Sequence, residues 1–291
     1  MKTMFEDYRQ KVEAFLADCL QDPDQPEQLT KAMHYSLQAG GKRIRPVLCL
    51  AWAEHFGLDP NRIISFASAL ELIHTYSLVH DDLPAMDNDD LRRGQPSSHI
   101  RFGEALAILA GDGLLTRAFE LMLSPDLDSD LLLAAARNVA QAAGPAGMVG
   151  GQVLDMQLTG QGQASVQSLK EMHSLKTGAM LSCSCCCGAI LAGAKQKDLQ
   201  KVEAFGQAVG LAFQVADDIL DITGDSQKMG KPVGSDQAQG KLTYPGLMGL
   251  DESMRLGQDL VQQAKEAISD YQGPQADFLR QLAHYIMHRV Q

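Results

Sequence analysis

Two acidic stretches carry most of the information in this sequence: HDDLPAMDNDDLRRG at residues 80–94 and QVADDILD at residues 214–221. Together they contain eight aspartates. A surface charge run is enough to explain Asp89 and Asp90, which leaves six candidate metal ligands: Asp81, Asp82, Asp87, Asp217, Asp218 and Asp221. Carboxylate oxygens are the ligands that magnesium prefers, and guanidinium groups such as those of Arg92 and Arg93 bind phosphate oxygens in pairs. The two stretches therefore predict magnesium sites with anion-binding side chains beside them.

The second stretch is expected to lie on a helix, because apolar residues recur at helical spacing through residues 202–222. At about 100° per residue, Asp217 and Asp221 fall about 40° apart, and Gln214 lies one turn before Asp218. We therefore expect these four polar groups to project together. Carboxylates so close to one another repel, so a cation should lie among them.

The first stretch is interrupted by Pro84. On an unbroken helix Asp81 and Asp87 would lie about 120° apart, but a helix that Pro84 kinks or ends can bring Asp87 back toward Asp81. Ser77 and His74 precede Asp81 by about one and two turns, so one helix face carries all three side chains. Taken alone, His74 is more often a core histidine than a ligand.

Most of the remaining chain is also predicted to be helical. Apolar residues repeat at helical spacing, with no alternating strand-like pattern, over residues 66–80, 106–123, 131–142, 202–222 and 278–290. Asp59, followed by a proline, and Ser165 are expected to cap helices, whereas Gly57 and Gly193 are expected to close them. The sequence therefore predicts an all-α protein, with a single domain over residues 1–291.

Composition limits the classes of partner. The chain has 291 residues, of which 45% are hydrophobic and 21% charged, as in a globular protein. Its formal net charge of -11 argues against nucleic-acid binding, which rests on a basic surface. An anionic substrate can bind to such an acidic chain only where positive charge is concentrated locally. The basic residues of GGKRIRP at residues 40–46 and of the first acidic stretch supply that charge. There Gly40 and Gly41 permit close approach of the backbone, and Pro46 is expected to begin a helix.

Location and membrane contact follow from two other segments. The amino terminus, MKTMFEDYRQKVEAF, lacks the apolar core of a secretory signal, so we expect a cytoplasmic protein. Residues 179–194 are uncharged but too few to span a bilayer, which favours a buried helix and no membrane contact. Four of the six cysteines lie in this segment, from Cys183 to Cys187. No second pair completes a zinc site, so we interpret them as core residues.

The polar tract at residues 223–245 is too long for an idle connection in a compact domain, so a functional lid is a reasonable hypothesis. Its lysines, Lys228, Lys231 and Lys241, are candidates for closing on an anion.

At this point the residues carry a family resemblance. GGKRIRP, DDLPAMDNDDLRRG, KTGAM, QVADDILD, GKPVGSD and KLTYP follow one another in the order seen in trans-isoprenyl diphosphate synthases, over residues 40–245. Pro84 and Ala85 lengthen the first motif to DDxxxxD, which resembles the bacterial-type farnesyl diphosphate synthases and the plant-type geranylgeranyl enzymes. The resemblance implies a large all-helical bundle around a deep central cavity, usually a homodimer.

The resemblance also implies roles for particular residues. Asp81, Asp82 and Asp87 would bind two Mg²⁺ ions, and Asp217, with Asp218 and Asp221 in support, would bind a third. Isopentenyl diphosphate would be held by Lys42, Arg45, His74 and Arg93. The allylic substrate, dimethylallyl or geranyl diphosphate, would be held by Arg92, Lys176, Thr177, Gln214, Lys231 and Lys241. Of these cations, Arg92, Lys176 and Lys231 would assist catalysis together with the aspartates.

The implied reaction is ionisation of the allylic diphosphate, followed by attack of the isopentenyl double bond on the resulting cation. The family points to Tyr76 as the floor that stops the product at fifteen carbons, although helical geometry puts Ser77 more directly beneath Asp81. Three alternatives differ in testable ways. A geranylgeranyl synthase would make a longer product, a terpene cyclase would need no second diphosphate site, and a non-catalytic binding subunit would show no turnover on its own.

Overall fold

The computed structural model describes the chain from residue 1 to residue 291 except for residues 23, 160–164, 225–239, 289 and 291. Its first half contains α1 (Lys2–Asp18), α2 (Glu27–Leu37), α3 (Ile44–His55), α4 (Ile64–Asp81), α5 (Ser98–Phe102), α6 (Glu104–Met122) and α7 (Ser129–Ala143). Its second half contains α8 (Met148–Leu158), α9 (Val166–His173), α10 (Ala179–Leu191), α11 (Gln196–Thr223), α14 (Tyr244–Met248), α15 (Leu250–Ala267) and α16 (Pro274–His288). Shorter elements are the 3₁₀ turn η1 (Pro60–Ile63), the π-helical turn η2 (Ser174–Gly178), and strands β1 (Leu91–Arg92) and β2 (Gln95–Pro96).

The prediction of an all-α protein is confirmed, since the two short strands are the only ones in the described part of the chain. The five segments with helical periodicity fall on α4, α6, α7, α11 and α16. The Asp59 side chain accepts a hydrogen bond from the Asn61 amide, and that of Ser165 accepts one from the Ser168 amide. Gly57 and Gly193, with φ of 87° and 71°, follow the ends of α3 and α10, as a glycine after a helix end should.

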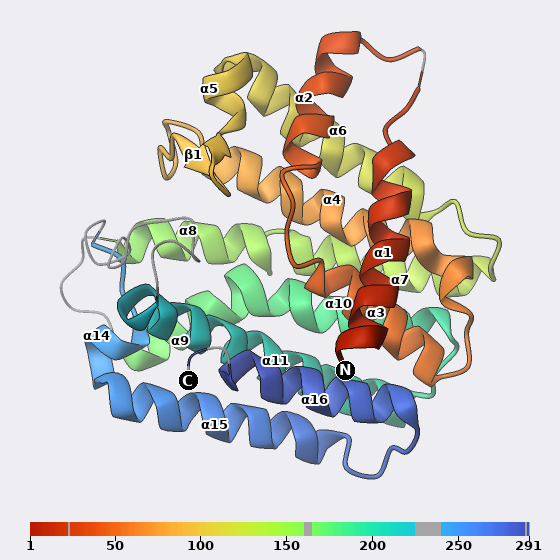
Figure 1. Ribbon diagram of the computed structural model, residues 1–291, viewed down its shortest axis with the longest axis vertical. Coiled ribbons are helices and arrows are strands. Elements are labelled where there is room, and N and C mark those ends of the chain that lie inside the picture. Colours follow the sequence, from red (N-terminus) through yellow and green to blue (C-terminus); the bar gives the residue numbers. More distant parts are fainter. Residues whose placement is uncertain (23, 160–164, 225–239, 289, 291) are drawn as a thin grey trace.

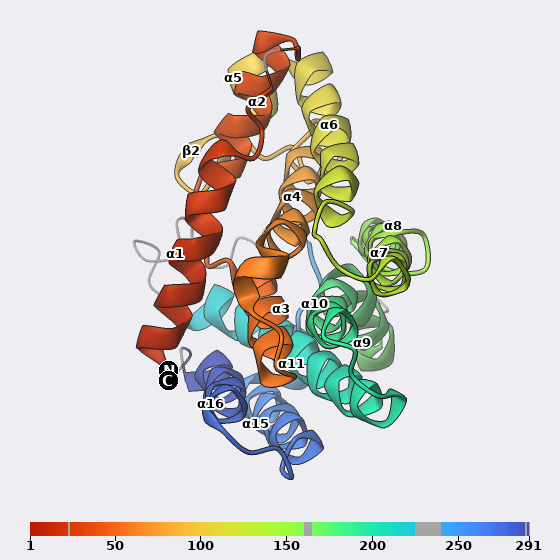
Figure 2. The same ribbon diagram turned by 90° about the vertical axis from the view of Figure 1, so that its right-hand side faces the viewer.

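The helices surround a central pair, α10 and α11 (Figure 1). Helix α10 packs against α3, α7 and α11. Helix α15 packs along α11, and α16 packs against both α11 and α15. Helices α4 and α6 pack against each other, and with α1 and α2 they form the upper part of the molecule in Figure 2. Turn η2 packs against α11, and its residues Lys176 and Thr177 line a cavity together with Asp81 at the end of α4.

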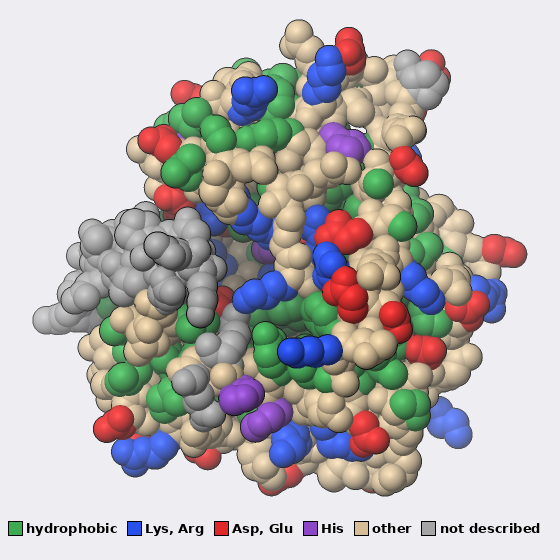
Figure 3. Space-filling view, in the orientation of Figure 1, with side chains coloured by type: hydrophobic (Ala, Val, Ile, Leu, Met, Phe, Trp, Pro, Cys, Tyr) green, Lys and Arg blue, Asp and Glu red, His purple; other side chains and the backbone are tan. Residues whose placement is uncertain are grey.

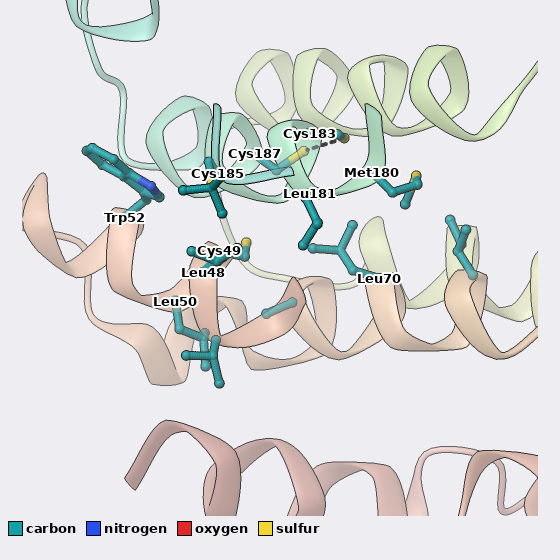
Figure 4. Close-up of a cluster of buried hydrophobic side chains, with 14 of the residues drawn as sticks. Leu48, Cys49, Leu50, Trp52, Leu70, Met180, Leu181, Cys183, Cys185 and Cys187 are labelled. Carbon is teal, nitrogen blue, oxygen red and sulfur yellow. Dashed lines mark hydrogen bonds between the residues drawn. The ribbon is translucent and has the colours of Figure 1, made fainter. Parts of the chain in front are cut away.

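The stretch Val166–Leu191 is long and apolar enough to cross a membrane by length and composition. Its α10 part is nevertheless a core helix, because Leu181 and Cys185 are buried and pack in the cluster that Trp52 and Leu48 of α3 also join (Figure 4). The buried environment outweighs the hydropathy, as we expected from the length of the uncharged segment.

The cysteines of α10 are core residues, as predicted. All six cysteines of the chain are free thiols, and Cys186 is the one that is half-buried while the other five are buried. The Sγ atoms of Cys183 and Cys187 lie 3.6 Å apart (Figure 4), and the Asn138 side-chain amide donates to both. Burial raises the pKa of the Cys186 thiol to about 12, so it has little tendency to form a reactive thiolate.

The local prediction about Pro84 is also confirmed. Helix α4 ends at Asp81, and the Asp87 amide donates a hydrogen bond of 2.8 Å to the Asp81 carbonyl. The chain therefore turns back at Pro84 and returns Asp87 to the end of the helix. The expected helix start at Pro46 was wrong by two residues, since α3 begins at Ile44.

Candidate functional site

Two adjoining cavities lie along α4 and η2, and the first extends to α11 whereas the second extends to α8. The larger, about 610 Å³, is lined by Lys42, Arg45, His74, Arg93, Gln214 and Asp217, among others, and we call it the basic chamber. The second, about 390 Å³, is lined by Tyr76, Ser77, Asp81, Met148, Gln152 and Lys176, among others, and we call it the apolar chamber. Arg45, His74 and Thr177 line both, so the two chambers meet at these side chains. Lysine and arginine side chains gather around a hollow on the face shown in Figure 3.

The four residues expected to hold one diphosphate, Lys42, Arg45, His74 and Arg93, all line the basic chamber. The Arg93 guanidinium donates to the Gly40 carbonyl and lies directly over Gly41. A Cβ on Gly41 would lie 2.9 Å from Arg93 Nη1, and Gly41 also has a φ of 138°. Glycine is therefore required there, and the group that approaches the backbone so closely is the Arg93 side chain.

Burial shapes the electrostatics of the basic chamber. It lowers the pKa of Arg45 and Arg93, against the opposing effect of the Glu71 carboxylate. It also lowers the pKa of His74 well below its usual range, and the neighbouring arginines lower it further. His74 is therefore neutral at pH 7, and the chamber presents fixed guanidinium charges beside a neutral imidazole.

Arg43 differs from the other basic residues of GGKRIRP. It is buried, and it donates to Glu71 Oε1 at 2.8 Å and to Glu13 Oε1 at 3.0 Å. Its charge is thus matched inside the protein by two carboxylates, although it still helps to lower the pKa of His74 and Arg93. Sequence reasoning missed Glu71, although its place one turn before His74 on α4 was a usable signal.

The first acidic stretch divides its carboxylates between two environments. Asp81 lines the apolar chamber, whereas Asp82 is buried and accepts a hydrogen bond of 2.9 Å from Arg92 Nε. Arg92 also pairs with Asp89 at 3.1 Å, so Asp89 is more than the surface charge we expected. Asp87 Oδ2 lies 3.3 Å from Lys241 Nζ, which joins this stretch to the segment before α14.

Lys176 is placed on the apolar chamber by η2, a π-helical turn of the kind often found at functional sites. Its Nζ lies 2.6 Å from Asp155 Oδ2. Burial disfavours the ammonium, yet the charges of Asp155 and Asp81 outweigh this effect and raise its pKa. Lys176 therefore stays charged at neutral pH. Asp155 was not predicted from the sequence, and its only signal was an isolated carboxylate in an otherwise uncharged α8.

Removing the buried charge of Asp81 is expected to stabilise the metal-free protein at neutral pH. Burial raises the pKa of Asp81 to about 6 from its ordinary value of 3.8, so the folded state binds a proton that the unfolded chain has released between these values. The stability of the wild-type protein thus falls as the pH rises through this window. We expect Asp81→Asn in EDTA to gain at most about 3 kcal/mol, or several degrees in Tm, at pH 7 relative to pH 4.

Differential scanning calorimetry at both pH values would measure this gain, with Asp126→Asn, an exposed loop aspartate, as the matched control. The same difference in Tm between Asp81→Asn and wild type at pH 4 and pH 7 would contradict the assignment of a raised pKa.

The second acidic stretch does not present all four polar groups to one place. Gln214 and Asp217 line the basic chamber. Asp218, turned about 100° further round α11, is buried and accepts a hydrogen bond of 2.9 Å from the Tyr244 amide. The Asp221 side chain is buried as well. The His173 Nε2 atom lies 3.4 Å from Asp218 Oδ2, so Asp218 connects three elements.

The remaining predicted residues are accounted for as follows. Thr177 lines both chambers, and Tyr76 and Ser77 both line the apolar chamber below Asp81. Lys231 and Lys228, with most of the proposed lid, lie outside the described residues.

The carboxylates of the two acidic stretches suit magnesium when a bound diphosphate supplies further oxygen ligands. In the described part of the chain, no three histidine, cysteine or acidic side chains are grouped closely enough to hold a metal ion by themselves. Magnesium commonly keeps several waters and takes one or two carboxylates together with phosphate oxygens. Asp81 and Asp87, which are close enough to repel each other, offer carboxylates from one side and Asp217 offers one from α11. These residues fit the ion.

Comparisons with known proteins agree with this geometry. Residues 26–275 match the model of the polyprenyl synthetase family. The farnesyl diphosphate synthase of Geobacillus stearothermophilus is 50% identical over 246 residues, which cover 83% of this chain and 82% of that protein. The geranylgeranyl diphosphate synthase of Cyanophora paradoxa is 46% identical, over 84% of this chain and 82% of that one. The apo crystal structure of an FPP/GFPP synthase from Zymomonas mobilis gives a TM-score of 0.87 at 36% identity and covers 98% of both chains. This chain therefore belongs to the polyprenyl synthetase family.

Proposed function

We propose that this chain is a short-chain prenyltransferase that condenses dimethylallyl or geranyl diphosphate with isopentenyl diphosphate to give farnesyl diphosphate. One observation carries the proposal: a chamber with guanidinium groups and a chamber with an apolar wall and the Asp81 carboxylate meet at Arg45, His74 and Thr177. Two diphosphates can then be bound side by side, with one hydrocarbon chain directed away from water.

In this proposal the basic chamber binds isopentenyl diphosphate through Lys42, Arg45, His74 and Arg93. The allylic diphosphate is bound by Arg92, Lys176, Thr177, Gln214, Lys231 and Lys241. Asp81, Asp82 and Asp87 would hold two magnesium ions and Asp217 a third, which supply positive charge to the leaving diphosphate. The buried Asp218 and Asp221 would support Asp217 indirectly, by fixing the position of α11; Asp218 does so through the Tyr244 amide.

The chain's own cations favour the ionisation step. Lys176 stays charged because its pKa is raised, and Lys241 is paired with Asp87. Both ammonium groups interact more strongly with a free diphosphate than with one still bonded to carbon, so they stabilise the products of ionisation and lower the barrier.

The second step, attack of the isopentenyl double bond on the allylic cation, depends on substrate orientation and on exclusion of water more than on a side-chain acid or base. The neutral imidazole of His74 and the charged guanidinium of Arg45 lie where the chambers meet. They orient isopentenyl diphosphate so that its double bond faces the allylic carbon. Met148 and Tyr76, which line the apolar chamber and are each 7% exposed, keep water away from the cation. The proton lost after bond formation passes to the departing diphosphate, so no side-chain base is required.

The proposal includes a homodimer. Helix α8 exposes an apolar stripe, in which Val153 and Met156 are 49% and 51% exposed, and Ile108 and Leu109 of α6 are exposed as well. Contiguous exposed apolar surface of this kind usually marks an interface with another chain.

The proposed function is tested by incubating the purified protein with magnesium, isopentenyl diphosphate and dimethylallyl diphosphate, then separating the products by chromatography. We expect farnesyl diphosphate as the main product and no turnover in EDTA, with activity restored by magnesium. Absence of any prenyl product would refute the enzyme and favour a binding subunit. Geranylgeranyl diphosphate as the main product would favour the longer-chain alternative, which the 46% identity to the Cyanophora protein keeps in view.

Tyr76→Ala is expected to lengthen the product. Tyr76 is 7% exposed and lines the apolar chamber, so loss of its ring opens the space beneath Asp81. Because the floor discriminates by volume, the ratio of longer product to farnesyl diphosphate should rise by at least about tenfold. The same chromatography measures the ratio, and Tyr271→Ala is the control, because Tyr271 packs against His55 and Phe56 and lines neither chamber. An unchanged distribution would remove Tyr76 from this role.

A further inference from the structure

His80 lies beside Tyr76 on the wall of the apolar chamber. Both side chains line this chamber, and the two rings meet edge to face with centroids 5.7 Å apart and an interplanar angle of 84°. The residues are one helical turn apart on α4, so they lie on the same stripe of the helix. The imidazole therefore supports the Tyr76 ring from the side.

The seat of the imidazole is provided by α6. His80 Nε2 lies 3.0 Å from the Ile108 carbonyl, and the ring occupies the space above Gly111. A Cβ on Gly111 would lie 2.1 Å from Nε2, which no side chain could tolerate without moving the ring. Glycine in a helix interior costs about 0.5–1 kcal/mol relative to alanine, so its presence here has a packing reason.

We propose that His80, seated on Gly111, is a further determinant of product length: it forms the side wall of the apolar chamber and holds the Tyr76 ring across it. This inference rests on the proposed function. The helical wheel places Ser77 more directly beneath Asp81 than Tyr76, so the Tyr76 ring must be held in position to act as a floor. Of the described residues, His80 makes the aromatic contact to Tyr76 that can do so.

Removing the imidazole has two effects in the same direction. It leaves an opening between α4 and α6 above Gly111, and it frees the Tyr76 ring to swing into that opening. Both enlarge the space available to a hydrocarbon longer than farnesyl. Replacing His80 with phenylalanine keeps a ring against Tyr76 and gives up the hydrogen bond to Ile108 and the 3.9 Å contact with Asp112.

The test compares product distributions of the full-length wild-type protein, His80→Ala and His80→Phe with magnesium, isopentenyl diphosphate and geranyl diphosphate. We expect the ratio of products longer than farnesyl diphosphate to farnesyl diphosphate to rise about tenfold in His80→Ala, the discrimination that a small change in pocket volume gives. His80→Phe should stay within about twofold of wild type. His55→Ala is the matched control, because His55 packs against Phe56 and Tyr271 away from both chambers.

An active His80→Ala with the wild-type distribution would overturn the inference, as would a shift of equal size in His55→Ala. If His80→Ala does not fold, His80→Leu makes the same test, and an unchanged distribution there overturns the inference as well. Failure of the proposed function looks different, because the wild-type protein itself would then yield no prenyl product.

Discussion

Arg45→Leu is expected to lower kcat/KM for isopentenyl diphosphate by about 10³-fold, since removing one partner of a buried charge pair costs several kcal/mol. Arg45 lines both chambers, and its buried Nε atom has no hydrogen-bond partner among the described residues. Burial lowers the pKa of its guanidinium, so the charge is held in a place where water solvates it poorly. A bound diphosphate supplies the missing partner.

Steady-state kinetics with each substrate varied in turn would measure this loss. The KM for isopentenyl diphosphate should rise, while the KM for the allylic diphosphate should change by less than about threefold, because other cations hold that substrate. Arg45→Lys keeps the charge but not the planar pair of donors, so it should recover only part of the activity. Arg62→Leu, which replaces an exposed arginine outside the chambers, is the control. An equal rise in both KM values in Arg45→Leu would contradict the assignment.

The sequence predicted those parts of the fold that depend on local pattern. Helical periodicity predicted α4, α6, α7, α11 and α16, because a buried helix face repeats every 3.6 residues whatever it packs against. Pro84 predicted the end of α4, because its ring excludes a further helical turn. Both signals are contained within a few neighbouring residues. For these helices the observed elements differ from the predicted ones only in the residues at which they begin and end.

The pairings that the sequence did not predict join residues far apart in the chain. Arg43 and Glu71 are separated by 28 positions, Lys176 and Asp155 by 21, and Asp218 and the Tyr244 amide by 26. No spacing rule connects such positions, because their distance depends on how whole helices pack. A helical wheel, which ranks Ser77 above Tyr76, likewise contains no information about α6 or about the contact of its Ile108 carbonyl with His80.

The second acidic stretch gives a prediction that separates binding from stability in two adjacent residues. Asp217→Ala should lower kcat by about 10³-fold, as loss of charge stabilisation at a reacting group does, with little change in Tm. Asp217 lines the basic chamber, where the proposed function places substrate and metal. Its variant should also need more magnesium for half-maximal activity.

Asp218→Ala should behave in the opposite way. It removes the acceptor for the buried Tyr244 amide and the contact with His173, and an unsatisfied buried amide costs about 1–3 kcal/mol, or roughly 3–10 °C in Tm for a chain of this size. Asp218→Asn keeps an acceptor oxygen and should recover most of that loss. Because α11 turns about 100° per residue, neighbouring aspartates must face different surroundings, and the helix sends one to the substrate and the other to α14. Calorimetry and kinetics on the three variants decide the point: equal losses of activity in Asp217→Ala and Asp218→Ala, with equal Tm values, would show that both carboxylates serve the chamber.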